Sequence, residues 1–390
     1  MTAPGHEPRL FYEPAAGDGV ADRDAGTRPA AGSDGPADAT VRPSPATAVP
    51  QAERLQDDAV AWDEFVAGTP LAPYLQATPW AVVKSRNGWT AERIVTDGPG
   101  GPVGGQILTR RLGRTPWSVG YTPRGPLAGR LDAECVLAWT QAARVFATRR
   151  GLTHVIADPE IEAGGPEAAW FAAAGWRPTA SPQPARTRWI DLTRAEPDLW
   201  ADLRAKWRQY VQKARRSGLA VVERDAGALD DFQSIYVETA RRAGFAYRTA
   251  ESYRAVYEAY AARGAARLLF AVDAAGVPQA TLMLVGWGRR VVEPYGGMTE
   301  AGAESHANYL LKWEAIRTSR ERGFALYDLW GLSHPGIEHF KAGFGGREVR
   351  YVGGLALPVR PWLYRAFESA RTVRVALARR RLQRSVEAAS

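Results

Sequence analysis

The stretch RLLFAVDAAGVPQATLMLVGWGRRVVEPYGG (267–297) precedes HANYLLKWEAIRTSRERG (306–323) and FALYDLWG (324–331), and together they carry the clearest pattern in the chain. The first segment holds three apolar runs separated by turns, which is typical of antiparallel strands. The second has apolar residues at helical spacing and ends at a glycine, and the third is a short apolar run. This order predicts a meander of strands, then a helix and a further strand.

A similar order occurs in the first half of the chain. QILTRRL (106–112) and WSVGYTP (117–123) indicate strands, AECVLAWTQAARVFATRRG (133–151) an amphipathic helix, and THVIADPEI (153–161) another strand. Before them, WAVVKSRNGW (80–89) reads as a β-prone run that ends at the hairpin signal Asn87-Gly88. The two halves therefore share one plan, and we expect a mixed α/β protein with an internal structural duplication.

The expected domain boundaries follow from this duplication. Residues 53–192 form the first unit, which ARTRWIDL (185–192) closes as a strand, and residues 193–350 form the second. The second unit begins with EPDLWADLRAKWRQYVQKARRSG (196–218), which predicts a single helix. Residues 1–52 are rich in proline, glycine and alanine and are expected to be a disordered leader. Residues 351–390 form a C-terminal segment that ends in an arginine-rich helix.

Composition excludes several classes of protein. The 390 residues are 45% hydrophobic and 24% charged, as in an ordinary soluble chain, and we find no apolar stretch of the roughly 20 residues that a membrane-spanning helix needs. The single cysteine, Cys135, allows neither an internal disulfide nor a cysteine-rich zinc site. Fifty lysines and arginines against 42 acidic residues give a net charge of +8, which favours polyanionic partners. We expect a cytoplasmic protein.

Common catalytic motifs are missing from the sequence. The five histidines lack the spacing of a metal site, and neither Gly-x-Ser-x-Gly nor a phosphate-binding P-loop occurs. Cys135 lies in a predicted amphipathic helix, where a buried thiol is the usual outcome. No metal and no cofactor are expected.

One group of motifs instead resembles a known family. YDLWG (327–331), GIEHFKAGFGG (336–346) and YVGG (351–354), taken with WAVVK (80–84), YTPRGP (121–126) and ADPEI (157–161), occur in the order found in the FemABX aminoacyltransferases. Members of this family move an amino acid from aminoacyl-tRNA onto the stem peptide of a peptidoglycan precursor.

The resemblance implies a fold and a subtype. The family fold is two tandem domains related to the GCN5 N-acetyltransferases (GNAT), with mixed, largely antiparallel sheets and flanking helices, and the last chain segment returns to the first domain. With one predicted helix between 196 and 218, the chain is similar to the FemX-like members that lack a helical-hairpin arm.

The resemblance also implies a set of site residues. Lys84, Arg248, Tyr253 and Tyr295 match positions that bind the precursor, although Ser252 stands where the family's tyrosine usually lies. Asp158 matches an aspartate that faces the stem peptide and could accept a proton from the acceptor amine. Phe340 and Lys341 match the pair associated with catalysis, and Lys341 could stabilise the oxyanion or help the ribose oxygen leave.

Two basic helices are candidates for polyanion binding. In a tRNA-dependent family, the first is expected to contact the nucleic acid through six cations: Arg204, Lys206, Arg208, Lys213, Arg215 and Arg216. The C-terminal helix sets apolar residues beside its arginines and could contact tRNA or an anionic membrane peripherally. The expected partners are thus aminoacyl-tRNA and a precursor, either UDP-MurNAc-pentapeptide or lipid II.

Two alternatives remain open from the sequence. A GNAT-fold N-acyltransferase could act on another peptide or small-molecule amine, with aminoacyl-tRNA or acyl-CoA as donor. No glycine-rich pyrophosphate loop precedes the 306–323 helix, which argues against acyl-CoA. A non-catalytic protein that binds RNA or lipid would explain the charge but not the FK-x-x-FGG motif.

Overall fold

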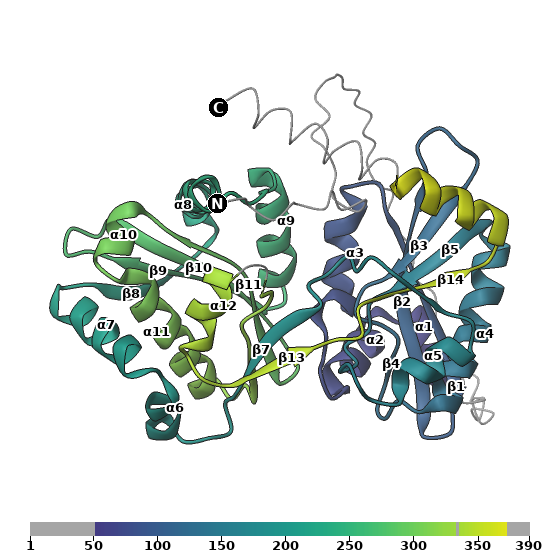
Figure 1. The fold of residues 1–390 in the computed structure, drawn as a ribbon, viewed down its shortest axis with the longest axis horizontal. Coiled ribbons are helices and arrows are strands. Elements are labelled where there is room, and N and C mark those ends of the chain that lie inside the picture. The colour runs from purple at the N-terminus through teal and green to yellow at the C-terminus, as the bar shows by residue number, and fades with distance from the viewer. Residues whose placement is uncertain (1–50, 333–334, 373–390) are drawn as a thin grey trace, which may run out of the picture.

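The structure is a computed structural model that describes residues 51–332 and 335–372. Two sheets flanked by helices lie side by side as two lobes (Figure 1). The expected mixed α/β class, with two largely antiparallel sheets, is confirmed. Residues 1–50 and 373–390, which contain nearly all of the expected leader and most of the C-terminal arginines, are outside the described residues.

The first sheet runs in the order β1-β2-β3-β5-β14-β6, with β4 paired to β2. β1, β2 and β3 form an antiparallel meander, whereas β3 and β5 are parallel and are connected through α4. Its strands are β1 (Thr90–Gly98), β2 (Gly101–Arg111), β3 (Ser118–Thr122), β4 (Leu127–Ala128), β5 (Leu152–Ala157), β6 (Arg177–Thr179) and β14 (Gly354–Pro358). The helices of this lobe are α1 (Gln51–Asp57), α2 (Ala59–Gly68), the 3-10 turn η1 (Tyr74–Gln76), α3 (Thr78–Ser85), α4 (Ala133–Arg149) and α5 (Glu167–Ala173).

The second sheet repeats this plan in the order β13-β7-β12-β11-β10-β9-β8. β8 to β11 form an antiparallel meander, and β11 and β12 are a parallel pair connected through α11. Its strands are β7 (Arg186–Asp191), β8 (Ala220–Arg224), β9 (Ala266–Val272), β10 (Pro278–Trp287), β11 (Arg290–Met298), β12 (Leu326–Asp328) and β13 (Arg347–Arg350). The helices of this lobe are α6 (Glu196–Asp202), α7 (Ala205–Arg216), the 3-10 turn η2 (Ala226–Ala228), α8 (Leu229–Ala243), α9 (Ala250–Ala261), α10 (Glu300–Glu304), α11 (Ala307–Glu321) and α12 (Pro335–Ala342).

Each lobe receives one strand from a distant part of the chain. β14, near the C-terminus, lies between β5 and β6 of the first sheet. β7 lies in the corresponding place of the second sheet, between β12 and β13. Residues 185–192, expected to close the first unit, instead place a strand in the second sheet, because an apolar pattern predicts that a strand forms but not which sheet receives it.

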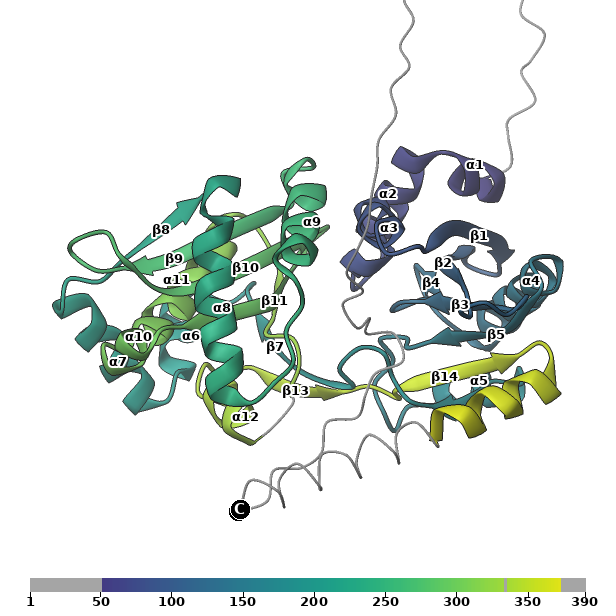
Figure 2. The same ribbon diagram turned by 90° about the horizontal axis from the view of Figure 1, so that it is seen from above.

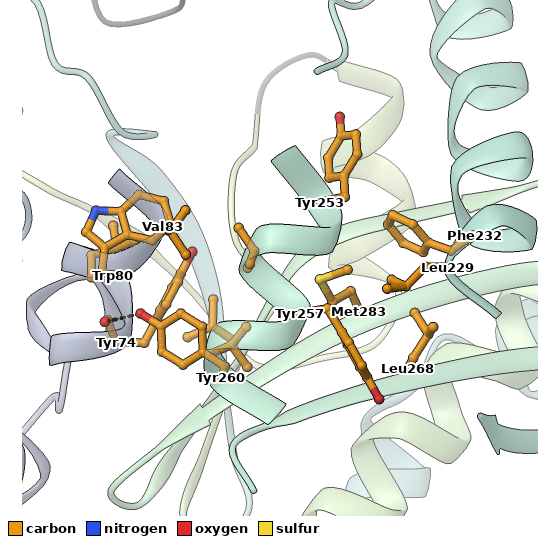
Figure 3. Close-up of a cluster of buried hydrophobic side chains, with 14 of the residues drawn as sticks. Tyr74, Trp80, Val83, Leu229, Phe232, Tyr253, Tyr257, Tyr260, Leu268 and Met283 are labelled. Atoms are coloured by element: carbon orange, nitrogen blue, oxygen red, sulfur yellow. Dashed lines mark hydrogen bonds between the residues drawn. The ribbon is translucent and has the colours of Figure 1, made fainter. Parts of the chain in front are cut away.

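The lobes also share a core at their junction. Successive residues of β9 face opposite sides of the sheet, as the strand period of two requires: Phe270 faces α8 and α9, whereas Leu269 faces α7 and α11. The cluster that contains Phe270 continues into the first lobe through Trp80 and Val83 of α3. Figure 2 shows α3 and α9 facing each other across the junction, and the Tyr260 hydroxyl donates to the Tyr74 carbonyl oxygen at 2.6 Å (Figure 3).

Two local predictions are wrong. WAVVKSRNGW does not begin as a strand, because 78–85 form α3. Pro79 lies in the first turn, where its missing N–H costs nothing, and Trp80, Val83 and Lys84 are buried at helical spacing. The segment 196–218 holds two helices rather than one, since Leu203 and Arg204 adopt extended backbone between α6 and α7.

Among the helices within 51–332 and 335–372, none combines the length and apolarity that a membrane crossing requires.

Candidate functional site

A small pocket opens at the junction of the two lobes. Lys84 reaches it from α3 of the first lobe, and Arg248 reaches it from the segment between α8 and α9 of the second. The side chains that line it are Trp80, Lys84, Trp89, Tyr121, Pro182, Gln183 and Arg248. Two residues predicted to bind the precursor, far apart in sequence, therefore meet in one pocket.

Lys84 is held in place by aromatic rings. Its side chain is only 8% exposed, and its ammonium lies 5.7 Å from the Trp80 ring centroid and 5.5 Å from that of Trp89. The guanidinium of Arg110 lies 4.7 Å from the centroid of the same Trp89 ring. Aromatic rings stabilise a cation that has lost part of its hydration shell. The two tryptophan rings therefore favour positive charge on this side of the pocket.

Arg248 is bonded to Tyr253, which packs against Tyr295. Its backbone N–H donates to the Tyr253 hydroxyl at 2.9 Å, and the rings of Tyr253 and Tyr295 meet edge to face with centroids 5.0 Å apart. Ser252 instead bonds with Thr249 at the start of α9. The structure thus brings Tyr253, not Ser252, next to Arg248.

Asp158 has a different setting from the expected one. Its carboxylate is fully buried and accepts hydrogen bonds from the Tyr121 hydroxyl (3.0 Å) and from the backbone N–H groups of Arg124 and Gln183 (2.9 Å each). Burial raises the pKa of Asp158, and the charge of Arg124 opposes that rise. Asp158 therefore does not face the pocket directly. It is bonded to Tyr121 and Gln183, and those two residues line the pocket.

A buried ionic network crosses the junction from this carboxylate. Arg124 lies 3.6 Å from Glu160, which also pairs with Arg290 of the second lobe at 2.5 and 2.8 Å. Arg290 in turn donates to Asp328, at the end of β12. Sequence reasoning missed all four residues, although Arg124, Glu160 and Asp328 lie inside motifs quoted for the family and a charge at the end of a buried strand was the available signal.

Lys341 lies on α12 with its ammonium turned toward the loop after β12. The Nζ atom donates to the carbonyl oxygens of Leu329 (2.6 Å), Trp330 and Gly331 (2.9 Å). Trp330 and Gly331 both have positive φ (49° and 59°), so the loop curls and three successive carbonyls converge. Burial lowers the pKa of Lys341 to about 8, against the raising effect of Glu293.

Phe340 belongs to an aromatic layer with Tyr309 and Phe344. Its ring centroid lies 5.1 Å from that of Tyr309 and 5.3 Å from that of Phe344. The ammonium of Lys312 lies 5.5 Å from the Phe340 centroid and pairs with Glu293, another buried charge pair that no sequence motif indicated.

Trp330 connects Lys341 to the residues around Asp158. Its carbonyl oxygen accepts from Lys341, its N–H donates to Asp328 at 2.8 Å, and its ring lies 5.0 Å from the Arg124 guanidinium. The Arg124 N–H is one of the donors to Asp158. Lys341 and Asp158 are thus joined through neighbouring residues at one junction and do not lie on separate faces.

The predicted tRNA-binding cations lie on and beside α7 with unequal roles. Arg208 donates to the Ala201 and Leu203 carbonyls, and Arg215 pairs with Glu314 at 2.6 Å. Arg204 lies 3.2 Å from the ring nitrogens of His339. Lys206, Lys213 and Arg216 are exposed on the outer face of the helix, whose other face buries Trp207, Val211 and Ala214.

Comparisons with known proteins agree with this architecture. A family model described as "FemAB family" matches residues 171–275 and 266–372. The chain is 26% identical over 218 residues to a lipid II:glycine glycyltransferase of Staphylococcus aureus strain MRSA252, covering 53% of this chain and 52% of the relative. The protein of that name from strain USA300 is 27% identical over the same length. The chain thus spans about half the length of these curated relatives.

A solved structure supports the fold. The crystal structure of FemX superposes with a TM-score of 0.74 at 19% identity, over 80% of this chain and 98% of that chain. A conserved protein of unknown function from Bacteroides thetaiotaomicron superposes less closely, with a TM-score of 0.52 at 10% identity, over 79% and 97% of the two chains. At such identities the likeness concerns the arrangement of the two lobes.

Proposed function

The chain belongs to the FemAB family, and from that premise we propose that it is a tRNA-dependent aminoacyltransferase that extends the stem peptide of a peptidoglycan precursor. The observation that carries the proposal is a chain of contacts between a cationic pocket formed by both lobes and the loop that binds Lys341. The chain starts at Tyr121, which lines the pocket and bonds to Asp158, and continues through Arg124 to Trp330.

The pocket is suited to a sugar diphosphate. Lys84 and Arg248 approach from opposite lobes, and a diphosphate placed between them would contact both cations. The aromatic rings around Lys84 restrict its motion, which lowers the entropy lost on binding. In our proposal the sugar diphosphate of the precursor binds in this pocket and thereby positions the stem peptide.

The acceptor amine must lose a proton before it attacks. A lysine-type amine has a pKa of about 10.4 in water, so near pH 7 only about one molecule in 2,500 is neutral, a handicap of roughly 4.6 kcal/mol. Tyr121 lines the pocket, and its hydroxyl donates to Asp158. We propose that the amine gives its proton to the Tyr121 oxygen as the Tyr121 proton moves to Asp158, whose pKa burial has raised.

Lys341 serves the other half of the reaction. The amine nitrogen bonds to the ester carbonyl carbon, and the bond to the ribose oxygen of the RNA then breaks. The ribose oxygen takes up the second proton, which the nitrogen releases as the amide forms. All three hydrogens of the Lys341 ammonium point to loop carbonyls. In our proposal one of these donors turns to the oxyanion that forms during attack, while the other two keep the ammonium in position.

Mass spectrometry tests this function directly. The protein is incubated with a mixture of charged tRNAs and either UDP-MurNAc-pentapeptide or lipid II, with acetyl-CoA alone as a control donor. We expect the precursor to gain the mass of one amino acid only in the presence of aminoacyl-tRNA. Acetylation of the precursor with acetyl-CoA, and no addition from any charged tRNA, would contradict the proposal.

A further inference from the structure

A continuous group of aromatic rings leads from the surface of α7 to Phe340. The rings of Tyr210 and His306 stack with centroids 4.0 Å apart and planes inclined by 24°. Tyr210 lies 4.8 Å from Tyr309, and Tyr309 lies 5.1 Å from Phe340, which precedes Lys341. Tyr210, His306 and Tyr309 are all partly exposed. This path connects the outer surface of the second lobe with the reacting centre.

The backbone fixes this arrangement. His306 takes the left-handed conformation (φ 60°) just before α11, which is uncommon for a residue with a side chain and sets its ring against Tyr210. The N–H of Arg204 donates to the Gly343 carbonyl oxygen at 2.9 Å, and the Trp207 indole donates to the Phe340 carbonyl oxygen at 3.0 Å. The start of α7 is therefore attached directly to α12.

Positive charge flanks the rings. The ammonium of Lys206 lies 5.6 Å from the Tyr210 ring centroid, and Lys213 is close enough to His306 to lower the pKa of that histidine, after the larger effect of burial. The α7 sequence, AKWRQYVQKARR, contains no acidic residue. Aromatic rings next to cations are the usual platform for single-stranded nucleic acid, since bases stack on the rings and phosphates meet the cations.

We propose that Tyr210 and His306 form a stacking platform for the unpaired 3′-terminal nucleotides of the RNA that carries the amino acid. This inference rests on the proposed function for the identity of the RNA. Lys206 and Lys213 contact its phosphates, and the layer of Tyr309 and Phe340 leads the esterified end toward Lys341. A double-stranded stem would gain nothing from the platform because its bases are already stacked.

The test compares two probes by fluorescence anisotropy at one fixed salt concentration. The first is uncharged tRNA with a complete 3′ end, and the second is the same tRNA without its last three nucleotides. Each is titrated with the native protein and with Tyr210→Leu, His306→Asn and Gln209→Ala. Leucine keeps apolar contact with Tyr309, and asparagine tolerates the left-handed backbone, so both variants are expected to fold. Gln209, exposed beside Tyr210 on α7, supplies the matched control.

We expect the native protein and Gln209→Ala to bind the complete tRNA about fivefold or more tightly than the shortened one, because each stacked base contributes measurably. In Tyr210→Leu and His306→Asn that ratio should fall toward one, with the affinity for shortened tRNA unchanged. A native-like ratio in both variants would overturn the proposal, as would a ratio of one in the native protein.

The same variants separate this inference from its alternatives. If both variants lose binding to phosphatidylglycerol vesicles but keep the native tRNA ratio, the platform is a lipid surface and the proposal is wrong. If the precursor gains no amino acid in the transfer assay while the tRNA ratio behaves as expected, the proposed function fails and the RNA platform stands.

Discussion

Arg290 of the second lobe forms a two-bonded ion pair with Glu160 of the first, at 2.5 and 2.8 Å. Both side chains are less than 5% exposed, and Arg290 also donates to Asp328, whose other oxygen accepts from the Trp330 N–H. The network that joins the lobes is therefore bonded to the loop that receives Lys341. We infer that lobe position and catalytic geometry depend on the same few charges.

Removal of this arginine should destabilise the whole protein. Arg290→Met leaves Glu160 and Asp328 as buried charges without their main partner, and breaking such a pair typically costs about 3–5 kcal/mol. We expect a clear fall in the free energy of unfolding measured with urea. Arg347→Met is the matched control, since Arg347 makes a similar two-bonded pair with Glu162 that is about half exposed. The free energy of unfolding of Arg347→Met should fall by about 1 kcal/mol or less. Equal losses in the two variants would contradict the assignment of Arg290 to a buried network that stabilises the protein.

Lys341 should set an upper pH limit on transfer. Burial lowers its pKa to about 8, below the ordinary value of 10.5, so the ammonium is present below pH 8 and is lost as the pH rises through that value. Because the charged form stabilises the oxyanion, the single-turnover rate should fall above about pH 8. Lys341→Met should lower the rate constant about 100-fold or more at pH 7, with little change in precursor affinity. An unchanged rate would remove Lys341 from the mechanism.

Lys84 should act mainly on precursor binding. Lys84→Ala removes one of the two pocket cations and should raise the KM for UDP-MurNAc-pentapeptide about tenfold or more, while kcat changes little. Arg86→Ala is the control, since Arg86 lies at the end of the same helix but pairs with Glu258 at the surface. Equal KM values for the native protein and Lys84→Ala would exclude a phosphate contact.

A variant of Tyr121 tests whether Asp158 accepts a proton during the reaction or has only a structural role. Tyr121→Phe keeps the ring but removes the hydroxyl that donates to Asp158, so kcat should fall about 10- to 100-fold while KM for the precursor stays near the native value. The loss should be smaller above pH 8, where more of the acceptor amine is already neutral. A native pH–rate profile in this variant would show that the amine loses its proton by another route.

Sequence patterns predicted much of the fold because period and turn chemistry are local. The meander 267–297 and the helix that follows it are present as expected. The sheet that β7 joins was not predictable from local patterns. β7 pairs with β12 rather than with a strand of the first sheet, and this pairing depends on contacts between residues about 140 positions apart. The helix at Lys84 was missed because valines favour strands locally, whereas its burial pattern is helical.

The candidate site was predictable to the extent that its residues lie in motifs. Lys84 and Arg248 meet in one pocket, and Tyr253 lies beside Arg248. The burial of Asp158 was not predictable, because the Tyr121 hydroxyl and two backbone donors reach it from separate segments. Arg290 completes the ionic network at the junction of the lobes. It lies in an ordinary strand sequence, where nothing nearby indicates a buried ion pair.

A crystal structure of the protein with UDP-MurNAc-pentapeptide tests the central claim most directly. The account predicts diphosphate density between the side chains of Lys84 and Arg248, with the acceptor amine of the stem within hydrogen-bond distance of the Tyr121 hydroxyl. A nucleotide bound outside the junction, with the stem amine remote from both Tyr121 and the Lys341 loop, would contradict it.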